Sequence, residues 1–331
     1  MPSSLLTSTA RRLGGALVLF WLVLTLTFAL VRLAPGDPAA FLIPPTATPA
    51  DAARVRAALG LDQPLLVQYA HWAADMLRGD LGTSFSLGRP VGSVLREALP
   101  VSIGLGAASL LLTFLVGVPL GLLQAAWHGR RADRAITMLS TAVYAAPTFW
   151  LALALVAVFT YGAATWGLPP ALRLPAFGLR TPGATASGTA ALLDVIRHAI
   201  LPVGILAAVG AAGIARYARA SAVELAGEDF IRTARAKGAS PRAVTYRHLL
   251  RNLWPPLIVL FALALPGVVA GSVFVESVFA WPGMGRVMLS AIAARDYPLV
   301  LGATSAYAAI VILANLSAEV LLPIVDPRRA R

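Results

Sequence analysis

The chain has 331 residues, of which 58% are hydrophobic and 13% are charged, and its mean hydropathy is +0.76. This balance excludes an ordinary soluble domain and indicates an integral membrane protein. The sequence contains no cysteine, which excludes disulfides and thiolate metal sites, and its four histidines stand singly without metal-ligand spacing.

Six apolar runs are long enough to cross a bilayer, which takes about 20 residues of α-helix. We therefore expect an all-α, polytopic membrane protein with six transmembrane helices. The first run is longer than the apolar core of a secretory signal, and no A-x-A-like cleavage site closes it, so we expect a retained helix. The runs cover residues 13–33, 101–126, 136–161, 198–218, 253–275 and 299–322.

The 27 lysine and arginine residues, set against 15 acids, give a formal net charge of +12 that follows the predicted loops. If the N-terminus is cytoplasmic, basic clusters at residues 11–12, 130–134, 216–251 and 328–331 all lie inside. The positive-inside rule therefore predicts a multi-pass protein with both termini in the cytoplasm and its spans in membrane lipid. Because the charge is distributed by loop and no aromatic stacking platform accompanies it, we expect no nucleic-acid binding.

The outer region between the first two spans, residues 34–97, opens with a helix stop at residues 35–38. A short amphipathic helix is expected to begin near Asp51, and a second one places Tyr69, Trp72 and Met76 on one side. We expect this second helix to lie on the membrane surface.

Glycine and proline lie inside several spans, for example Gly117, Gly121 and Pro147, and permit close helix packing or kinks. Ionisable side chains are nearly absent from the span interiors, so the spans carry no evident energy-coupling machinery. Of the loops between spans, the inner HGRRADR is expected to be only a tight positive turn. The outer loop at residues 162–197, rich in glycine and proline, is expected to be poorly structured.

A basic, hydrophilic segment, residues 219–251, separates the fourth and fifth spans. It is too polar for hydrocarbon and is expected to project from the membrane as a docking surface. Gly238 can end one helix in the left-handed conformation, Ser240 can cap the next, and Pro241 suits its first position, which predicts a cytoplasmic helix-turn-helix. The first helix is expected to present a small apolar knob amid positive charge, formed by Phe230, Thr233, Ala234, Arg232, Arg235 and Lys237.

The sequence DFIRTARAKGASPRAVTYRHLLRNLWPP around this turn resembles the coupling loop of permease subunits of bacterial ABC importers, in the dipeptide, oligopeptide and nickel family. That loop is named for a Glu-Ala-Ala pattern followed by three residues and glycine. Aligned on Gly238, the named positions fall on Arg232, Thr233 and Ala234, so the glutamate is absent and the Arg-Thr-Ala version resembles the peptide subgroup. Four further motifs are similar to the family in the same order: FALVRLAPGDPA, GLDQPLLVQYAHWAADMLRGDLGTSF, FVESVFAWPGMGRVMLSAIAARDYPLV and DPRRAR.

The resemblance implies a single permease domain over residues 1–331 in the bacterial inner membrane. Its implied partners are a second homologous permease subunit, two cytoplasmic ATPase subunits and an external substrate-binding protein. The chain itself is then not an enzyme and holds no cofactor or metal, since ATP and Mg belong to the ATPase. In agreement, it has no Gly-x-x-x-x-Gly-Lys-Ser/Thr motif, and Lys237 is its only lysine. The expected ATPase contacts are Asp229, Phe230, Arg232, Thr233, Ala234, Arg235, Lys237 and Gly238.

The resemblance also implies that the segment VFVESVFAWPGMGRVMLSAIAARDYP, before the last span, forms an outer gate beneath the binding protein. A rigid re-entrant turn, two glycines with unusual backbone angles and a water-exposed rim are expected there. The simpler alternative is an ordinary loop with an interfacial tryptophan. The expected gate residues are Trp281 and Pro282 for the turn, Gly283 and Gly285 for the glycines, and Glu276 and Asp296 for the rim.

We therefore expect the membrane-spanning subunit of an ATP-driven importer, forming the pathway for short peptides or similar small solutes. Nickel chelates and oligosaccharides are the alternative cargoes. A self-sufficient channel or secondary transporter is a second function class, disfavoured by the uncharged spans. A membrane-embedded enzyme is a third, disfavoured because no nucleophile, base and acid can be assembled within the membrane.

Overall fold

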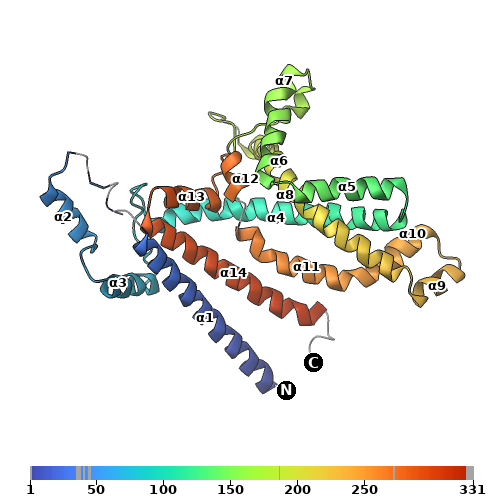
Figure 1. Ribbon diagram of the computed structural model, residues 1–331, viewed down its shortest axis with the longest axis horizontal. Helices are drawn as coiled ribbons and strands as arrows, with labels where there is room; N and C mark the ends of the chain where they lie inside the picture. The colour runs from blue at the N-terminus through green and yellow to red at the C-terminus, as the bar shows by residue number, and fades with distance from the viewer. Residues whose placement is uncertain are drawn as a thin grey trace. The chain divides into compact units, whose positions relative to one another are not determined.

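The structure, a computed structural model, describes residues 2–34, 39, 42–43, 46–185, 187–270 and 273–325. For residues 2–10, 12, 269–270 and 318–325 it describes the backbone alone. Every regular element in this part of the chain is a helix, apart from one isolated bridge between Thr83 and Pro90 (Figure 1). The helix stop predicted at residues 35–38 lies outside the described residues.

Six helical stretches of the described chain are long and apolar enough to cross a membrane. The all-α prediction and the predicted number of six spans are therefore confirmed. The second and fourth stretches run for 36 and 38 residues, so their helices continue well beyond the apolar runs. The stretches are Leu13–Leu33, Val91–Ala126, Thr148–Thr165, Gly188–Leu225, Pro241–Val268 and Tyr297–Ser317.

The third predicted span, residues 136–161, is wrong as a single helix. The chain forms α5 (Arg131–Ala145) and then α6 (Thr148–Val156), separated by Pro147 and by Ala146, which is extended with ψ 140°. Proline lacks a backbone donor and disfavours the helical conformation of the residue before it, so α5 ends there. The membrane-long stretch is α6 together with the π-helical turn η2 (Ala157–Gly162) and α7 (Ala163–Thr165).

The chain folds into two compact units. The first unit comprises Met1–Ser102 and Gly283–Leu316. An apolar cluster holds this unit together, with Val91, Met284 and Leu299 among its buried side chains. Its elements are α1 (Pro2–Leu33), α2 (Pro49–Ala58), α3 (Leu65–Leu77), the first turns of α4 (Val91–Ala126), α13 (Met284–Ala293) and most of α14 (Tyr297–Val325).

The amphipathic helix α3 packs its aromatic side against α1. The Phe28 ring of α1 lies 5.3 Å, between centroids, from the rings of both Tyr69 and Trp72. On other sides of α3, Leu66 and Leu77 are largely exposed. Tyr69 and Trp72 therefore share one side as predicted, and the exposed leucines suit contact with lipid at the membrane surface.

The second unit comprises Ile103–Pro282 with Ser317–Arg331. Within it, α5 and α6 pack along α8, as the ribbon also shows (Figure 1). Besides the rest of α4 and the elements α5 to α7, it contains the turn η3 (Pro170–Leu172), α8 (Gly188–Leu225), α9 (Asp229–Ala236), α10 (Pro241–Ala243), the π-helical turn η4 (Val244–Leu249), α11 (Leu250–Ala270) and α12 (Val273–Val278).

Small residues let the long helices of the second unit approach closely. A Cβ atom placed on Gly121 of α4 would lie 2.4 Å from the Ala215 carbonyl oxygen of α8. One placed on Gly106 would lie 2.0 Å from the Val268 carbonyl oxygen of α11. Both distances are far inside van der Waals contact, so these crossings require glycine.

The loop at residues 162–197, which the sequence places on the outer side, is more ordered than predicted. Leu174 and Ala176 are buried in an apolar cluster with side chains of α6, α8 and α12. The Leu174 N–H donates to the Phe159 carbonyl at 3.0 Å, which ties the loop to η2. The prediction was wrong because two apolar side chains suffice to anchor a segment that is otherwise rich in glycine and proline.

Candidate functional site

A sharp turn ends α9, and Gly238 makes it possible. Gly238 has φ +81°, in the left-handed region that side chains resist. Its N–H donates to the Arg235 carbonyl at 2.9 Å, and the Ala239 N–H donates to the Ala234 carbonyl at 3.1 Å. These two bonds form the Schellman pattern, which satisfies the last carbonyls of a helix and reverses the chain.

The second helix of the motif begins at Ser240, whose side chain accepts a hydrogen bond from the Ala243 N–H at 3.3 Å. Pro241 occupies the first helical position, where its missing N–H is not needed. The helix then continues through α10 and η4 into α11 (Figure 1). The predicted helix, turn and helix are therefore confirmed, and the turn leads directly into the fifth span.

Two buried side chains anchor the inner face of α9. Ile231 is fully buried, and Ala234, one turn further on, is 7% exposed. Ile231 packs in an apolar cluster that includes Leu122 of α4, Ala222 of α8 and Leu253 of α11. The prediction that Ala234 belongs to the outward knob is therefore wrong, because its side chain faces its own chain. Sequence reasoning missed Ile231, although the i, i+3 spacing of the two apolar residues indicates a buried face.

The outer face of α9 is exposed, polar and charged around one aromatic side chain. Phe230 is 38% exposed, and the neighbouring Asp229 and Arg232 form an ion pair of 3.1 Å in which both side chains are largely in solvent. An exposed pair of this kind contributes about 0–1 kcal/mol, so a partner can replace it at little cost. The predicted residues on this face and its turn are Asp229, Phe230, Arg232, Thr233, Arg235, Lys237 and Gly238, all exposed.

A buried ion pair joins α5 to the last turns of α8, close in sequence to this motif. Arg219 donates through Nε and Nη2 to the two carboxylate oxygens of Asp133, at 2.7 and 2.8 Å. Asp133, whose side chain is 2% exposed, also accepts a bond from the Gly129 N–H at 3.0 Å. The hydrogen bond from Arg219 is the main cause that lowers the pKa of Asp133 to about 2. The inner loop predicted to be only a tight turn is thus an anchor on α8.

The predicted outer segment begins in the second unit with α12 and a tight turn. Glu276 is fully buried, so its prediction as a water-exposed rim residue is wrong. The Trp281 side chain is only 3% exposed, so this tryptophan is a core side chain and not an interfacial one. The backbone N–H of Trp281 donates to the Glu276 carbonyl at 2.7 Å and closes the turn. Pro282, which follows the turn, is exposed.

The later part of the outer segment belongs to the first unit and is held by Asp296. Its carboxylate accepts bonds from the hydroxyls of Ser84 and Ser86 at 2.6 and 2.7 Å, and from the Leu299 N–H at 3.2 Å. Burial acts to raise the pKa of Asp296, but the bonds from the two serines outweigh it and lower the pKa. The prediction of a water-exposed Asp296 is wrong, because this carboxylate is fully buried and caps α14.

Neither glycine of the outer segment takes an unusual backbone angle, which corrects a further prediction. Gly283 has φ −101° and ψ −179°, an ordinary extended conformation, and Gly285 lies inside α13. The left-handed residues are Ala280 and Arg295, with φ 47° and 53°. Non-glycine residues persist in this conformation only where the surrounding structure holds them, so these turns are rigid.

Two family models match nearly the whole chain. Residues 117–331 match the binding-protein-dependent transport system inner membrane component, and residues 5–106 match the N-terminal part of such a membrane component. The chain belongs to this family. It is 36% identical over 304 residues to the oligopeptide transport system permease protein AppB of Bacillus subtilis, covering 92% of each chain.

Two further comparisons concern a second permease and a solved structure. The chain is 36% identical over 331 residues to the probable D,D-dipeptide transport system permease protein DdpB of Escherichia coli, covering 97% of this chain and 96% of that one. A structure of the MetNI methionine ABC transporter in an inward-facing conformation aligns with a TM-score of 0.49 and 18% identity, over 70% of this chain and 96% of the other.

Membership in this family makes the chain the non-catalytic membrane subunit of a binding-protein-dependent ABC importer. It is a multi-pass inner membrane protein that works in a complex with ATPase subunits and carries no cofactor of its own. The importer class and the non-catalytic role predicted from the resemblance are therefore confirmed. Among the described residues, no group of three or more His, Asp or Glu side chains could hold a metal ion.

Proposed function

We propose that this chain forms, with a second homologous permease subunit, the translocation pathway for short peptides delivered by an external substrate-binding protein. Peptides are proposed as the cargo because the chain is 36% identical, over nearly its full length, to permeases named for oligopeptide and D,D-dipeptide transport. The metal-ligand sets that a nickel cargo would favour are absent from the described residues. Nickel chelates and oligosaccharides are the alternative cargoes.

The ATPase is proposed to dock on the outer face of α9. This face offers Phe230 as an apolar anchor with the charges of Arg232 and Lys237 near it, a composition that suits a groove with acidic walls. The inner face of the same helix is fixed by Ile231 to α4, α8 and α11, so a force applied to Phe230 reaches three spans within one turn of helix. The proposed contacts are Asp229, Phe230, Arg232, Thr233, Arg235, Lys237 and Gly238.

In this proposal α9 and both termini lie in the cytoplasm, and residues 1–331 act as one permease domain. The clustering of basic residues at the loops on the α9 side supports the orientation. The segment from Glu276 to Asp296 then lies on the outer side, where the binding protein docks. The core tryptophan and the left-handed residues Ala280 and Arg295 support the rigid turn proposed for this gate.

Reconstitution of the complete complex tests the cargo and the importer role together. ATP hydrolysis is measured with the binding protein loaded with di- to pentapeptides, with a nickel chelate or with an oligosaccharide. We expect stimulation by the peptide-loaded protein alone. Stimulation only by a non-peptide ligand would overturn the cargo, and hydrolysis indifferent to any binding protein would overturn the proposed role of that protein as well.

A further inference from the structure

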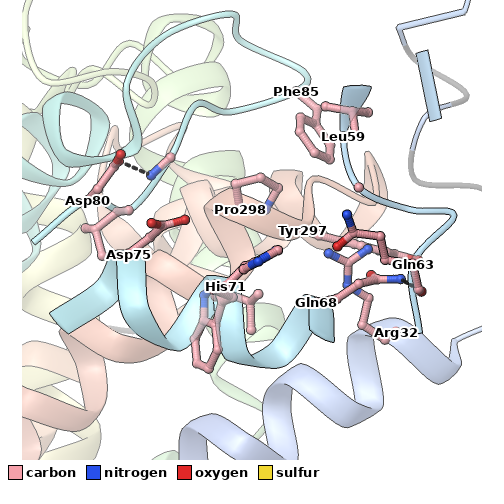
Figure 2. Close-up of a pocket in the computed structure, with 15 residues that line it drawn as sticks. Arg32, Leu59, Gln63, Gln68, His71, Asp75, Asp80, Phe85, Tyr297 and Pro298 are labelled. Carbon is pink, nitrogen blue, oxygen red and sulfur yellow. Dashed lines mark hydrogen bonds between the residues drawn. The ribbon is translucent and has the colours of Figure 1, made fainter. Parts of the chain in front are cut away.

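A cleft of about 210 Å³ lies within the first unit, in the region between the end of α1, α3 and the start of α14. It is smaller than the roughly 300–1,000 Å³ of drug-sized pockets, and so suits a ligand of about two small residues. Figure 2 shows that its charged side chains are sorted by sign: Arg32 lies at one end, Asp75 and Asp80 lie at the other, and His71 lies between them.

The positive end of the cleft is a guanidinium that has no counterion among the described residues. Arg32 lies over two aromatic rings, 5.4 Å from the Phe28 centroid and 5.6 Å from the Tyr297 centroid, and this fixes its position. Within the residues that the structure describes, Arg32 makes no ion pair, and its buried Nε has no acceptor. A half-buried guanidinium in this state is prepared to bind a carboxylate.

A second unsatisfied atom lies beside it. Gln68 is held by its Nε2, which donates to the Gln63 carbonyl at 2.7 Å, while its buried Oε1 has no donor among the described residues. Figure 2 places Gln68 next to Arg32. Within the described part of the chain, this end of the cleft therefore lacks one acceptor, for Arg32 Nε, and one donor, for Gln68 Oε1. The C-terminal end of a peptide supplies both, because its carboxylate is adjacent to an amide N–H.

The negative end of the cleft has capacity to spare. Among the described residues, the Asp75 carboxylate pairs with the exposed Arg78 alone, at 3.5 Å, and Asp80 accepts one hydrogen bond, from the Gly82 N–H at 2.8 Å. Each carboxylate can accept further hydrogen bonds from a cation. A ligand with an ammonium group at this end and a carboxylate at the Arg32 end would therefore pair with the charges at both ends of the cleft.

We propose that this cleft binds a dipeptide-sized zwitterion, with its carboxylate on Arg32, its amide N–H on Gln68 and its ammonium at Asp75 and Asp80. The proposal rests on the proposed function for the peptide class of the ligand. It adds a peptide site on the permease itself, separate from any site on the binding protein, at the end of the first span.

The test measures binding of alanyl-alanine to the purified complex in phosphatidylcholine nanodiscs, without binding protein or ATP, by saturation-transfer NMR titration. Two analogues separate the charges: alanyl-alanine amide lacks the carboxylate, and N-acetyl-alanyl-alanine lacks the ammonium. We expect the amide to bind about tenfold or more weakly, as expected for a lost charge-assisted pair. The acetyl analogue should bind several-fold more weakly. The comparisons with the two analogues use the unaltered chain, so they test the proposed binding site independently of how any variant folds.

Arg32→Gln should weaken alanyl-alanine by about the same tenfold and abolish the difference between the dipeptide and its amide. Arg96→Gln is the matched control, since Arg96 is an exposed arginine of the same unit that does not line the cleft. Equal binding of dipeptide and amide, or no binding at all, would overturn the proposal. So would loss of binding when phosphatidylethanolamine replaces phosphatidylcholine, because a lipid headgroup would then occupy the cleft. Failure of the binding protein to stimulate ATP hydrolysis is a separate measurement and would count against the proposed function instead.

Discussion

Asp133 and Arg219 show how a single ion pair can join two helices that are far apart in the sequence. Asp133 also accepts the Gly129 N–H, so one carboxylate fixes both the turn before α5 and the last turns of α8. Because α8 leads into α9 after Leu225, the pair also positions the start of the proposed docking helix. Removing one partner would leave a buried or half-buried charge without compensation, which costs more than the intact pair contributes.

Asp133→Asn should lower the free energy of unfolding by about 1–3 kcal/mol at neutral pH, because Arg219 loses its charge-assisted bonds. Asp229→Asn is the matched control, since that aspartate also pairs with an arginine but is 93% exposed. It should cost less than about 1 kcal/mol. Denaturant unfolding of the purified chain in detergent measures both, and equal losses would show that the Asp133 pair has no special role.

The effect of Asp133→Asn should also depend on pH. The pKa of Asp133 in the folded chain, about 2, lies below its ordinary value of 3.8. The carboxylate therefore stabilises the fold fully above about pH 4, and this stabilisation is lost as the pH falls toward about 2. The unfolding curves of the unaltered chain and the variant should converge over that range. A gap that stays constant down to about pH 2 would show that charge is not what holds the pair.

Gly238→Val should abolish transport while membrane insertion and assembly continue. No atom lies within 4 Å of a Cβ placed on Gly238, so the whole penalty comes from its φ of +81°. That conformation costs about 1–2 kcal/mol for a residue with a side chain, and Asn tolerates it better than a β-branched residue. Gly238→Asn is therefore the control and should retain most of the transport. Full transport by the Val variant would contradict the role assigned to this turn.

At the scale of one element, the two faces of α9 have different roles. Ile231 and Ala234 face inward and are buried, while Phe230 and the charged residues face solvent. The helix is only 8 residues long, so it depends on this inner contact and on the Schellman turn at its C-terminal end. Packing and docking are thus assigned to adjacent positions of the same helix.

Alanine at two adjacent positions of α9 should therefore give opposite results. Ile231→Ala should lower the free energy of unfolding by about 2–5 kcal/mol, the usual cost of truncating a buried aliphatic side chain. Phe230→Ala should change stability by less than about 0.5 kcal/mol, as expected at the surface. It should instead weaken binding of the ATPase subunit several-fold or more, measured by titration in nanodiscs. The reverse pattern would mean that Phe230 is the anchor and Ile231 the contact.

Elements that depend on neighbouring residues could be predicted from the sequence, whereas those that depend on contacts with distant residues could not. The turn at Gly238, Ser240 and Pro241 follows from local backbone preferences, so it was predicted residue by residue. The i, i+3 spacing of Ile231 and Ala234 indicates that α9 has a buried face, but the partners of Ile231 on α4, α8 and α11 are distant in the sequence and no local pattern reveals them. The same holds for Asp296, whose bonds to the serines cross more than 200 residues. Burial of acids by distant partners is the part that pattern reasoning missed.

At the scale of the whole molecule, the spans and the charge distribution are complementary signals. Apolar length alone defines the six stretches, whereas orientation comes only from the basic residues of the loops. Continuous helices extend some stretches beyond the membrane: α8 runs for 38 residues and carries Arg219 near its end. The side of the membrane on which α9 lies therefore decides whether its outer face can meet an ATPase.

Reporter fusions can determine that side directly. With an even number of spans and basic loops inside, fusions after Arg131, Ser240 and Arg331 should report the cytoplasm, and fusions after Thr48 and Thr185 the opposite side. Alkaline phosphatase activity and green fluorescence, measured on the same set of truncations, give complementary readings, because each reporter is active on one side only. Ser240 is the decisive position, since it lies in the turn that follows α9. A reading of Ser240 on the outer side would reverse the orientation, remove α9 from reach of a cytoplasmic ATPase, and place the cleft around Arg32 on the wrong side for a solute that enters from outside.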